Sequence, residues 1–208
     1  MKGLLLKDFY ILRDNLLILF IVLLAVGAGM SYLTSAWVLI TTAAIIMSMI
    51  VPATISSDKT SQWHRFAATL PVSRKQLVAS KYFMYGILCL GGLLAGALVS
   101  LPITLMKGQF EMDTLLIFVF TGIILCLVSG GISIPCYFLL SEDKSVVAAM
   151  LSYMATTGLF VAGILVANAF FDIKNNLVTA GAAGAVMSIG FYILSLCLSQ
   201  KYLPKKDL

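Results

Sequence analysis

Five long stretches of the chain contain no Asp, Glu, Lys, Arg or His, and together they make up most of its 208 residues. They cover residues 15–57, 82–106, 114–141, 145–171 and 175–200. An apolar helix of about 20 residues crosses a hydrocarbon core of about 30 Å, so each of the last four is long enough to span a membrane. The first has 43 residues and is long enough to cross twice. The pattern therefore predicts six membrane-spanning helices.

The fold class that follows is an all-α integral membrane protein. Apolar residues make up 61% of the chain and charged residues only 11%, whereas soluble domains usually carry about a quarter charged residues. The longest segment outside the predicted spans, residues 56–81, is too short to hold a catalytic domain. We therefore expect a single domain over 1–208, with spans at about 15–31, 36–55, 82–105, 114–139, 146–170 and 177–199.

The distribution of basic residues predicts the orientation. Basic residues concentrate in the cytoplasmic loops of membrane proteins, and the bias is strongest in short loops. If both termini face the cytoplasm, 12 of the 14 Lys and Arg lie on that side: Lys2, Lys7, Arg13, Lys59, Arg65, Arg74, Lys75, Lys81, Lys144, Lys201, Lys205 and Lys206. Only Lys107 and Lys174 then lie in the outer loops. Residues 1–14 mix charged and apolar side chains, which favours a short interfacial helix before the first span.

The same distribution narrows the function. The excess of basic residues is explained by topology, and no basic face with groove-reading partners indicates nucleic-acid binding. Ion-coupled carriers usually place ionisable residues inside the membrane, and intramembrane hydrolases need paired carboxylates or an H-E-x-x-H motif. The predicted spans contain neither, although sodium sites built from carbonyl and hydroxyl oxygens stay open. We expect no catalytic site, metal site or cofactor site in this chain.

The segment 56–81 is the most informative part outside the spans. Ser57 or Asp58 is a candidate helix cap, and an apolar stripe follows at Trp63, Phe66, Ala67 and Leu70. Pro71 ends this helix, and Ser73 with Gln76 forms a capping box that starts the next one. A helix this short is not stable alone, so its stripe must be buried. The pattern leaves open whether it packs on the membrane surface, on the chain's own helix ends or in a groove of another protein.

Prolines and small residues mark candidate hinges and packing sites. Pro52, Pro71 and Pro135 are candidate hinges, with static bends as the alternative. Small residues at helical spacing let helix backbones approach closely, within one chain or between two. The glycines at such positions in the predicted spans are Gly92, Gly96, Gly158, Gly181 and Gly184.

Several of these motifs resemble one known family. The stretch from Asp58 through Trp63 and L-P-V-S-R-K at 70–75 to Lys81 and Tyr82 resembles the first cytoplasmic loop of ABC-2 type exporter permeases. The opening LLLKDFYILR resembles their N-terminal elbow helix, and Pro135 followed by SEDKSV at 141–146 resembles their second cytoplasmic turn. More narrowly, the chain is similar to the small bacterial permeases that export phenol-soluble modulins and related antimicrobial peptides.

The resemblance implies a mechanism. It identifies residues 58–70 as a coupling helix that contacts a separate ATPase through Asp58, Gln62, Trp63, His64, Arg65, Phe66 and Leu70. The chain contains no G-x-x-x-x-G-K-[ST] motif, so ATP and Mg²⁺ are expected in that partner. The family pattern implies two ATPase subunits and two permeases, identical or paralogous, in a bacterial cytoplasmic membrane.

The cargo and the rival functions remain open at this point. Apolar walls suit an amphipathic peptide, a lipid or a hydrophobic drug. The rival functions are a passive or ion-driven carrier without an ATPase, and a membrane scaffold that transports nothing.

Overall fold

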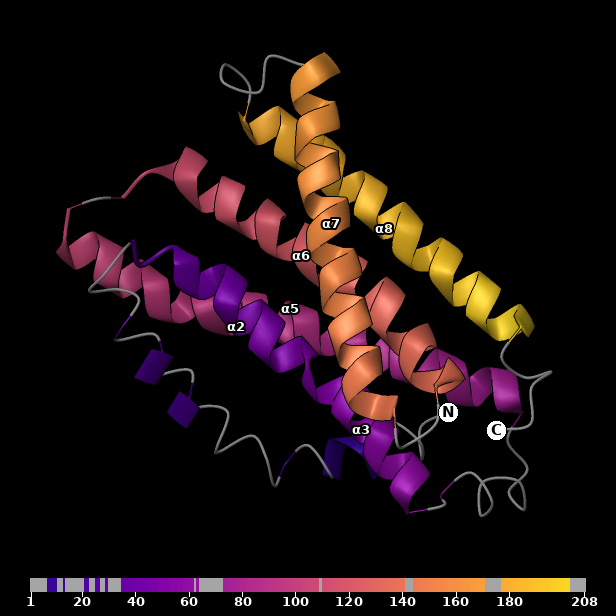
Figure 1. The fold of residues 1–208 in the computed structure, drawn as a ribbon. Helices are drawn as coiled ribbons and strands as arrows, with labels where there is room; N and C mark the ends of the chain where they lie inside the picture. The colour runs from indigo at the N-terminus through magenta and orange to yellow at the C-terminus, as the bar shows by residue number, and fades with distance from the viewer. Residues whose placement is uncertain are drawn as a thin grey trace.

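The chain forms a bundle of long helices in a computed structural model, shown in Figure 1. The structure describes residues 7–10, 13, 21–22, 25–26, 29, 35–61, 63, 73–108, 110–140, 144–170 and 177–202. Across these ranges no β-strand occurs, so the predicted all-α class is confirmed for the described residues. The helices are α2 (Val38–Ser48), α3 (Ile50–Thr60), α5 (Arg74–Met106), α6 (Met112–Leu139), α7 (Ser145–Phe170) and α8 (Leu177–Tyr202).

The described residues contain five helical segments that are long and apolar enough to cross a membrane. They are Val38–Thr60, Lys75–Met106, Met112–Leu139, Ser145–Val166 and Leu177–Tyr202, which correspond to the last five predicted spans. Most of the predicted first span, 15–31, lies outside the described residues. The total of six spans and the cytoplasmic location of both termini therefore stay predictions. Residues 7–10 are helical, within the segment predicted to form the elbow helix.

The first candidate span is divided into α2 and α3 by a single residue, Met49, whose backbone keeps helical dihedrals (φ −62°, ψ −17°) and whose N–H still donates to the Ile45 carbonyl at 3.0 Å. Pro52 lies in the first turn of α3 and has no backbone N–H, so it cannot donate to the Ser48 carbonyl four residues earlier. The division between α2 and α3 falls beside that missing hydrogen bond. Pro102 and Pro135, in contrast, lie inside the continuous helices α5 and α6.

The segment between α3 and α5 differs in part from the prediction. The helix boundary lies at Ser61, because α3 continues to Thr60, so the predicted caps at Ser57 and Asp58 are wrong. The apolar run from Ile50 carries α3 past the polar residues that suggested a new start. At the other end the predicted capping box is confirmed: the Gln76 N–H donates to Ser73 Oγ at 3.3 Å, and the Ser73 N–H donates to Gln76 Oε1 at 3.2 Å.

Two glycines bring α5 into contact with the backbone of α2. A Cβ atom on Gly92 would lie 2.6 Å from Ala44 Cα, and one on Gly96 would lie 2.7 Å from Ile40 Cα. Any larger side chain at either position would push the helices apart. Ala43 and Ala44 are fully buried on the opposite side of this contact.

Helix α8 packs against α6 through a similar exchange of small and large residues. Gly181 and Gly184 of α8 lie against Phe120 and Ile124 of α6, at 3.2 and 2.9 Å from a Cβ built on each glycine. Gly131 of α6 lies in turn against the Phe191 ring of α8. Gly158 of α7 differs, because a Cβ there would meet no atom within 4 Å.

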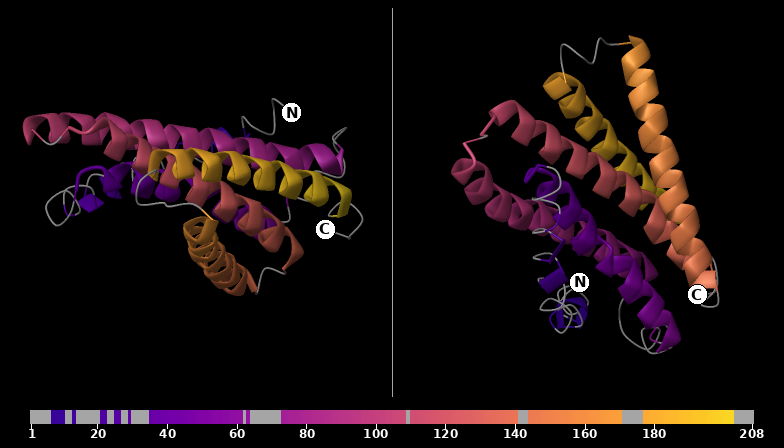
Figure 2. Two further views of the ribbon diagram at one scale, coloured as in Figure 1. Left: turned by 90° about the horizontal axis from the view of Figure 1, so that it is seen from above. Right: turned by 60° about the vertical axis from the view of Figure 1, so that its left-hand side comes forward.

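The core has two apolar clusters along the bundle. One joins α3, α5 and α6 around Val51, Ile55, Val78, Tyr82, Tyr85 and Ile134. The other joins α2, α5 and α6 around Trp37, Ile40, Ala44, Cys89, Leu93 and Cys126. Helix α7 contributes to neither cluster. It packs mainly against α6 and stands at the edge of the bundle in both views of Figure 2.

Candidate functional site

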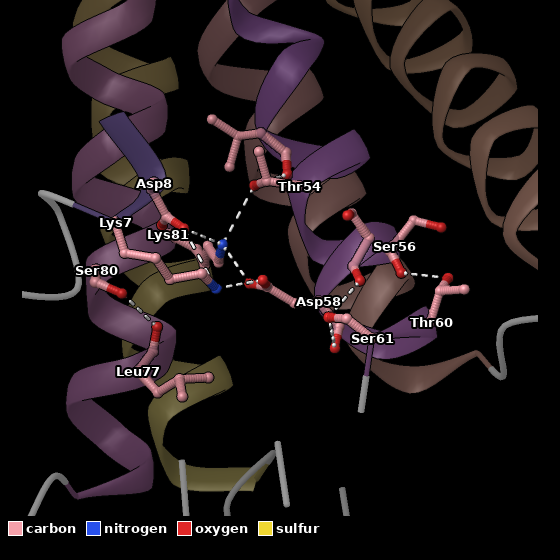
Figure 3. A network of polar contacts seen from close by, with 12 residues as sticks. Lys7, Asp8, Thr54, Ser56, Asp58, Thr60, Ser61, Leu77, Ser80 and Lys81 are labelled. Carbon is pink, nitrogen blue, oxygen red and sulfur yellow. Dashed lines mark hydrogen bonds and ion pairs between the residues drawn. The ribbon is translucent and has the colours of Figure 1, made fainter. Parts of the chain in front are cut away.

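A distinctive feature of the fold is a group of four charged side chains, Lys7, Asp8, Asp58 and Lys81, here called the four-charge cluster, of which all but Lys7 are buried. Lys81 Nζ lies 2.9 Å from Asp8 Oδ1 and 2.7 Å from Asp58 Oδ2. Lys7 also pairs with Asp58, and its Nζ lies 3.9 Å from Asp8 Oδ1. Figure 3 shows these side chains converging between α3, α5 and the N-terminal helical residues.

The burial of this cluster is what makes it informative. Asp8, Asp58 and Lys81 expose only 2%, 4% and 4% of their surface. Moving a charge out of water costs several kcal/mol unless an opposite charge and hydrogen bonds replace the water. Two cations and two anions give a formal charge of zero, and each member of the cluster has an oppositely charged partner. The group is therefore compensated only while the three segments stay together.

Helix periodicity places the groups that surround Lys81. Thr54 and Asp58 are four residues apart on α3, so they lie on one face, one turn from each other. Lys81 reaches both, since its Nζ also donates to Thr54 Oγ1 at 3.2 Å. Lys81 itself lies two turns into α5, beyond the capping box at Ser73. Its ammonium group thus connects the N-terminal segment, α3 and α5.

Lys59, the residue after Asp58 in α3, connects the end of α3 to α6. Its Nζ donates to the carbonyls of Tyr137 at 2.7 Å, Phe138 at 3.2 Å and Leu140 at 2.6 Å. The last carbonyls of a helix lack partners within the helix and carry partial negative charge. A lysine at this position satisfies them and holds the end of α3 against the end of α6.

Trp63 is a predicted coupling residue that follows α3 and lies within the described residues. Its side chain packs against the chain's own helices. It is half-buried against the cluster around Val51 and Tyr82, and Lys7 Nζ lies 4.1 Å from the centre of its ring. An ammonium group at this distance over an indole ring is a favourable cation–π contact. Of the alternatives left open for the apolar stripe, the structure places this member on the chain's own helix ends.

The other predicted coupling residues are only partly covered by the structure. Asp58 belongs to the four-charge cluster. Gln62, His64, Arg65, Phe66 and Leu70, with the candidate hinge Pro71, lie outside the described residues. Their role as an ATPase contact stays a prediction.

A second polar network joins α5, α6 and α8 next to the four-charge cluster along α5. Ser195 Oγ donates to the Gly131 carbonyl at 2.6 Å, so it must accept from the Tyr82 hydroxyl, which lies 2.9 Å away. Because Tyr82 donates its one hydroxyl proton to Ser195, Ser199 Oγ, 2.8 Å away, must donate to the Tyr82 oxygen. Tyr192 adds a bond from its hydroxyl to the Tyr82 carbonyl at 2.7 Å.

The sequence places the four charged residues on the cytoplasmic side, and it did not lead us to expect that they would form one cluster. The available signal was Lys7 and Asp8 standing between apolar residues in LLLKDFY, a poor composition for a solvated surface. The described residues contain no group of three His, Cys, Asp or Glu side chains that could hold a metal ion. What the four-charge cluster can do chemically is hold helix ends together.

The helices define a multi-pass membrane protein whose charged side chains at one end connect separate helices. Residues 3–203 match the family model described as ABC-2 family transporter protein. The match covers nearly the whole chain, so the chain belongs to the ABC-2 transporter family, whose members are the membrane components of ABC exporters. No match was found among curated proteins or among solved structures. The narrower resemblance to exporters of phenol-soluble modulins stays a prediction.

Proposed function

We propose that this chain is the permease subunit of an exporter that moves amphipathic peptides out of the bacterial cytoplasm, driven by a separate ATPase. The observation that carries the proposal is the family match over residues 3–203. A second copy or a paralogue completes the transmembrane unit, and two ATPase subunits bind ATP and Mg²⁺. The passive carrier and the scaffold are the competing functions.

The composition of the helices supports an apolar or amphipathic cargo. Between Lys81 and Lys107, α5 carries no charged side chain, and between Asp113 and Glu142 the sequence through α6 carries none. A pathway between such helices has no fixed charge to bind a small polar ion. A peptide with one apolar face can bury that face there. A lipid or a hydrophobic drug would use the same surface and is an alternative outcome of the transport assay.

The proposed ATPase contact lies beyond Ser61, in the segment that connects α3 to α5. Asp58 and Trp63 face the chain's own helices, which leaves as candidates for direct contact Gln62, His64, Arg65, Phe66 and Leu70. An apolar helical stripe in a groove of the partner is a common mode of recognition. Because this segment connects two candidate spans, force applied to it acts on both of them.

Purification of the native complex tests the partnership. The tagged chain should co-purify with a polypeptide that contains a Walker A motif, as identified by mass spectrometry. Phe66→Ala should reduce the co-purified ATPase, whereas Phe83→Ala, which removes an exposed aromatic ring of α5, should not. Recovery of the chain without any nucleotide-binding partner would refute the proposed ATPase partnership.

Transport into inside-out vesicles tests the cargo. A fluorescent amphipathic helical peptide should accumulate with ATP and fail to accumulate with a non-hydrolysable analogue. Uptake of a labelled phospholipid or a hydrophobic dye instead of the peptide would reject the peptide as the cargo. ATP-independent uphill transport by the purified chain would reject the exporter model itself.

A further inference from the structure

Adjacent residues at the end of α3 hold that helix from two directions. Asp58 is bound by Lys81 of α5 and by Lys7 of the N-terminal helical segment. Lys59 is bound to three carbonyls at the end of α6. One helical turn of α3 is thus connected to three other segments, and the contacts to α5 and to residues 7–10 are charged and buried.

The Asp58–Lys81 pair also closes the base of the proposed coupling segment. The segment leaves α3 at Ser61, three residues after Asp58, and enters α5 at Ser73, two helical turns before Lys81. The 2.7 Å ion pair therefore holds together the two helices that the segment connects. Lys81 is central, since it binds Asp8, Asp58 and Thr54 at once.

At its other end α3 adjoins α2 through Met49, whose backbone keeps helical dihedrals. Helix α2 is held against α5 by the close contacts at Gly92 and Gly96. Between this fixed part and the charged end of α3, Pro52 leaves the Ser48 carbonyl without its helical donor. A sideways displacement of the α3 end is therefore most easily absorbed next to Met49, where one helical hydrogen bond is missing.

We propose that Lys81 is a positioning residue for coupling: the four-charge cluster and Lys59 hold the ends of α3, α5 and α6 as one unit, and this unit moves about Met49 when the coupling segment is displaced. That the ATPase displaces the coupling segment rests on the proposed function. The geometry of the unit is a property of the chain alone, so it can be tested without the ATPase.

The test measures the distance between spin labels at Thr60→Cys on α3 and Phe83→Cys on α5, both exposed positions, by electron double resonance on the full-length purified chain in lipid nanodiscs. Cys136 and Cys197 are first replaced by Ser, and Cys89 and Cys126 are buried. The parent should give a narrow distribution. Lys81→Met should broaden it and shift it to longer distances. Lys75→Met, which removes an exposed cation from the same helix, should leave it unchanged.

The double variant Asp58→Asn/Lys81→Met separates positioning from stability. Each single substitution leaves a net buried charge, whereas the pair restores a formal charge of zero. The double variant should therefore recover most of the thermal stability that Lys81→Met loses. Its distance distribution should stay broad, because no ion pair connects α3 to α5. A narrow distribution in the Lys81→Met variant, or in the double variant, would overturn the proposal even if the ATPase partnership is real.

Discussion

Ser195 on α8 supplies the hydrogen-bond donor that Pro135 on α6 lacks. In a regular helix the residue at 135 would donate its N–H to the Gly131 carbonyl, and proline has no N–H to give. The Ser195 hydroxyl occupies that carbonyl at 2.6 Å instead. Membrane helices tolerate proline where a neighbouring helix satisfies the freed carbonyl. The bond accounts for a continuous α6 and makes Pro135 a point of attachment between two helices in this conformation.

Removing the Ser195 hydroxyl should destabilise the bundle. Ser195→Ala leaves the Gly131 carbonyl without a donor, which typically costs about 1–3 kcal/mol for a buried polar group. Ser188→Ala is the matched control on α8, because that hydroxyl bonds only to the Ala185 carbonyl of its own helix. Thermal unfolding in detergent should show a lower midpoint for Ser195→Ala only. Combining it with Pro135→Ala should recover part of the loss, since residue 135 can then donate.

A side chain at Gly96 should separate α5 from α2. A Cβ atom there would lie 2.7 Å from Ile40 Cα, a backbone atom that cannot turn aside, so Gly96→Val should cost about 1–3 kcal/mol or more. Gly91→Val, on the same helix, meets no atom within 4 Å and serves as the control. Equal unfolding midpoints for the two variants would contradict the close packing.

Loss of the Lys59 ammonium should loosen the end of α6. Lys59→Met removes the donor from the carbonyls of Tyr137, Phe138 and Leu140, and helix ends without partners fray. Hydrogen exchange should quicken over the last turn of α6, while exchange in α2 stays as in the parent. Lys75→Met provides a comparison with equal loss of charge. Unchanged protection of α6 would mean that Lys59 is not its cap.

Trp63 and Phe66 should differ in what their removal affects. Trp63→Ala takes an aromatic ring from the chain's own cluster and from Lys7, so it should lower thermal stability as well as ATPase recovery. Phe66→Ala should lower ATPase recovery alone if it lies in the partner's groove. A loss of stability without any loss of ATPase in both variants would place the stripe entirely within the permease.

Gly158 should affect the contact between two copies of the chain and not the stability of one copy. A Cβ there meets nothing within 4 Å in one chain, so Gly158→Leu should leave the unfolding midpoint unchanged. If α7 packs against the second permease, as small-residue spacing favours, the same change should reduce the dimer fraction in nanodiscs. Gly190→Leu on α8 also meets no atom within 4 Å and is the control. Equal dimer fractions would move the contact away from this face of α7.

The sequence was enough to predict the helices whose apolar runs are bounded by charged residues. Asp113 and Glu142 bound the apolar run of α6, and the capping box of Ser73 and Gln76 marks the start of α5. Hydropathy and capping rules were therefore sufficient for these two helices. The continuation of α3 to Thr60 could not be read in this way. Ser57 and Asp58 look like a new start, yet Asp58 has a buried lysine as its partner, and that partner is decided by tertiary packing.

The site was predictable only in its location. The first cytoplasmic loop stood out from its motif, but the pairing of Lys81 with Asp8 joins residues 73 positions apart. The helical periodicity of a sequence does not indicate contacts between residues so far apart in the chain. The glycine spacing gave equal weight to Gly92, which lies against the α2 backbone, and to Gly158, where an added Cβ would meet no atom of the described residues within 4 Å. Spacing indicates that a close approach is possible, and the neighbouring helix determines whether it occurs.

The peripheral position of α7 has a consequence for the surrounding lipid. Ala148, Ser152 and Thr156 are buried on this helix, which packs mainly against α6, whereas every residue from Val161 to Val166 is exposed. In a single copy, so little protein surrounds the far half of this helix that it can change its tilt when the hydrocarbon layer becomes thinner or thicker, whereas the packed α2–α5 pair resists. Bilayer thickness should therefore act on this permease first through α7, and acyl-chain length becomes a setting to be controlled in any activity assay.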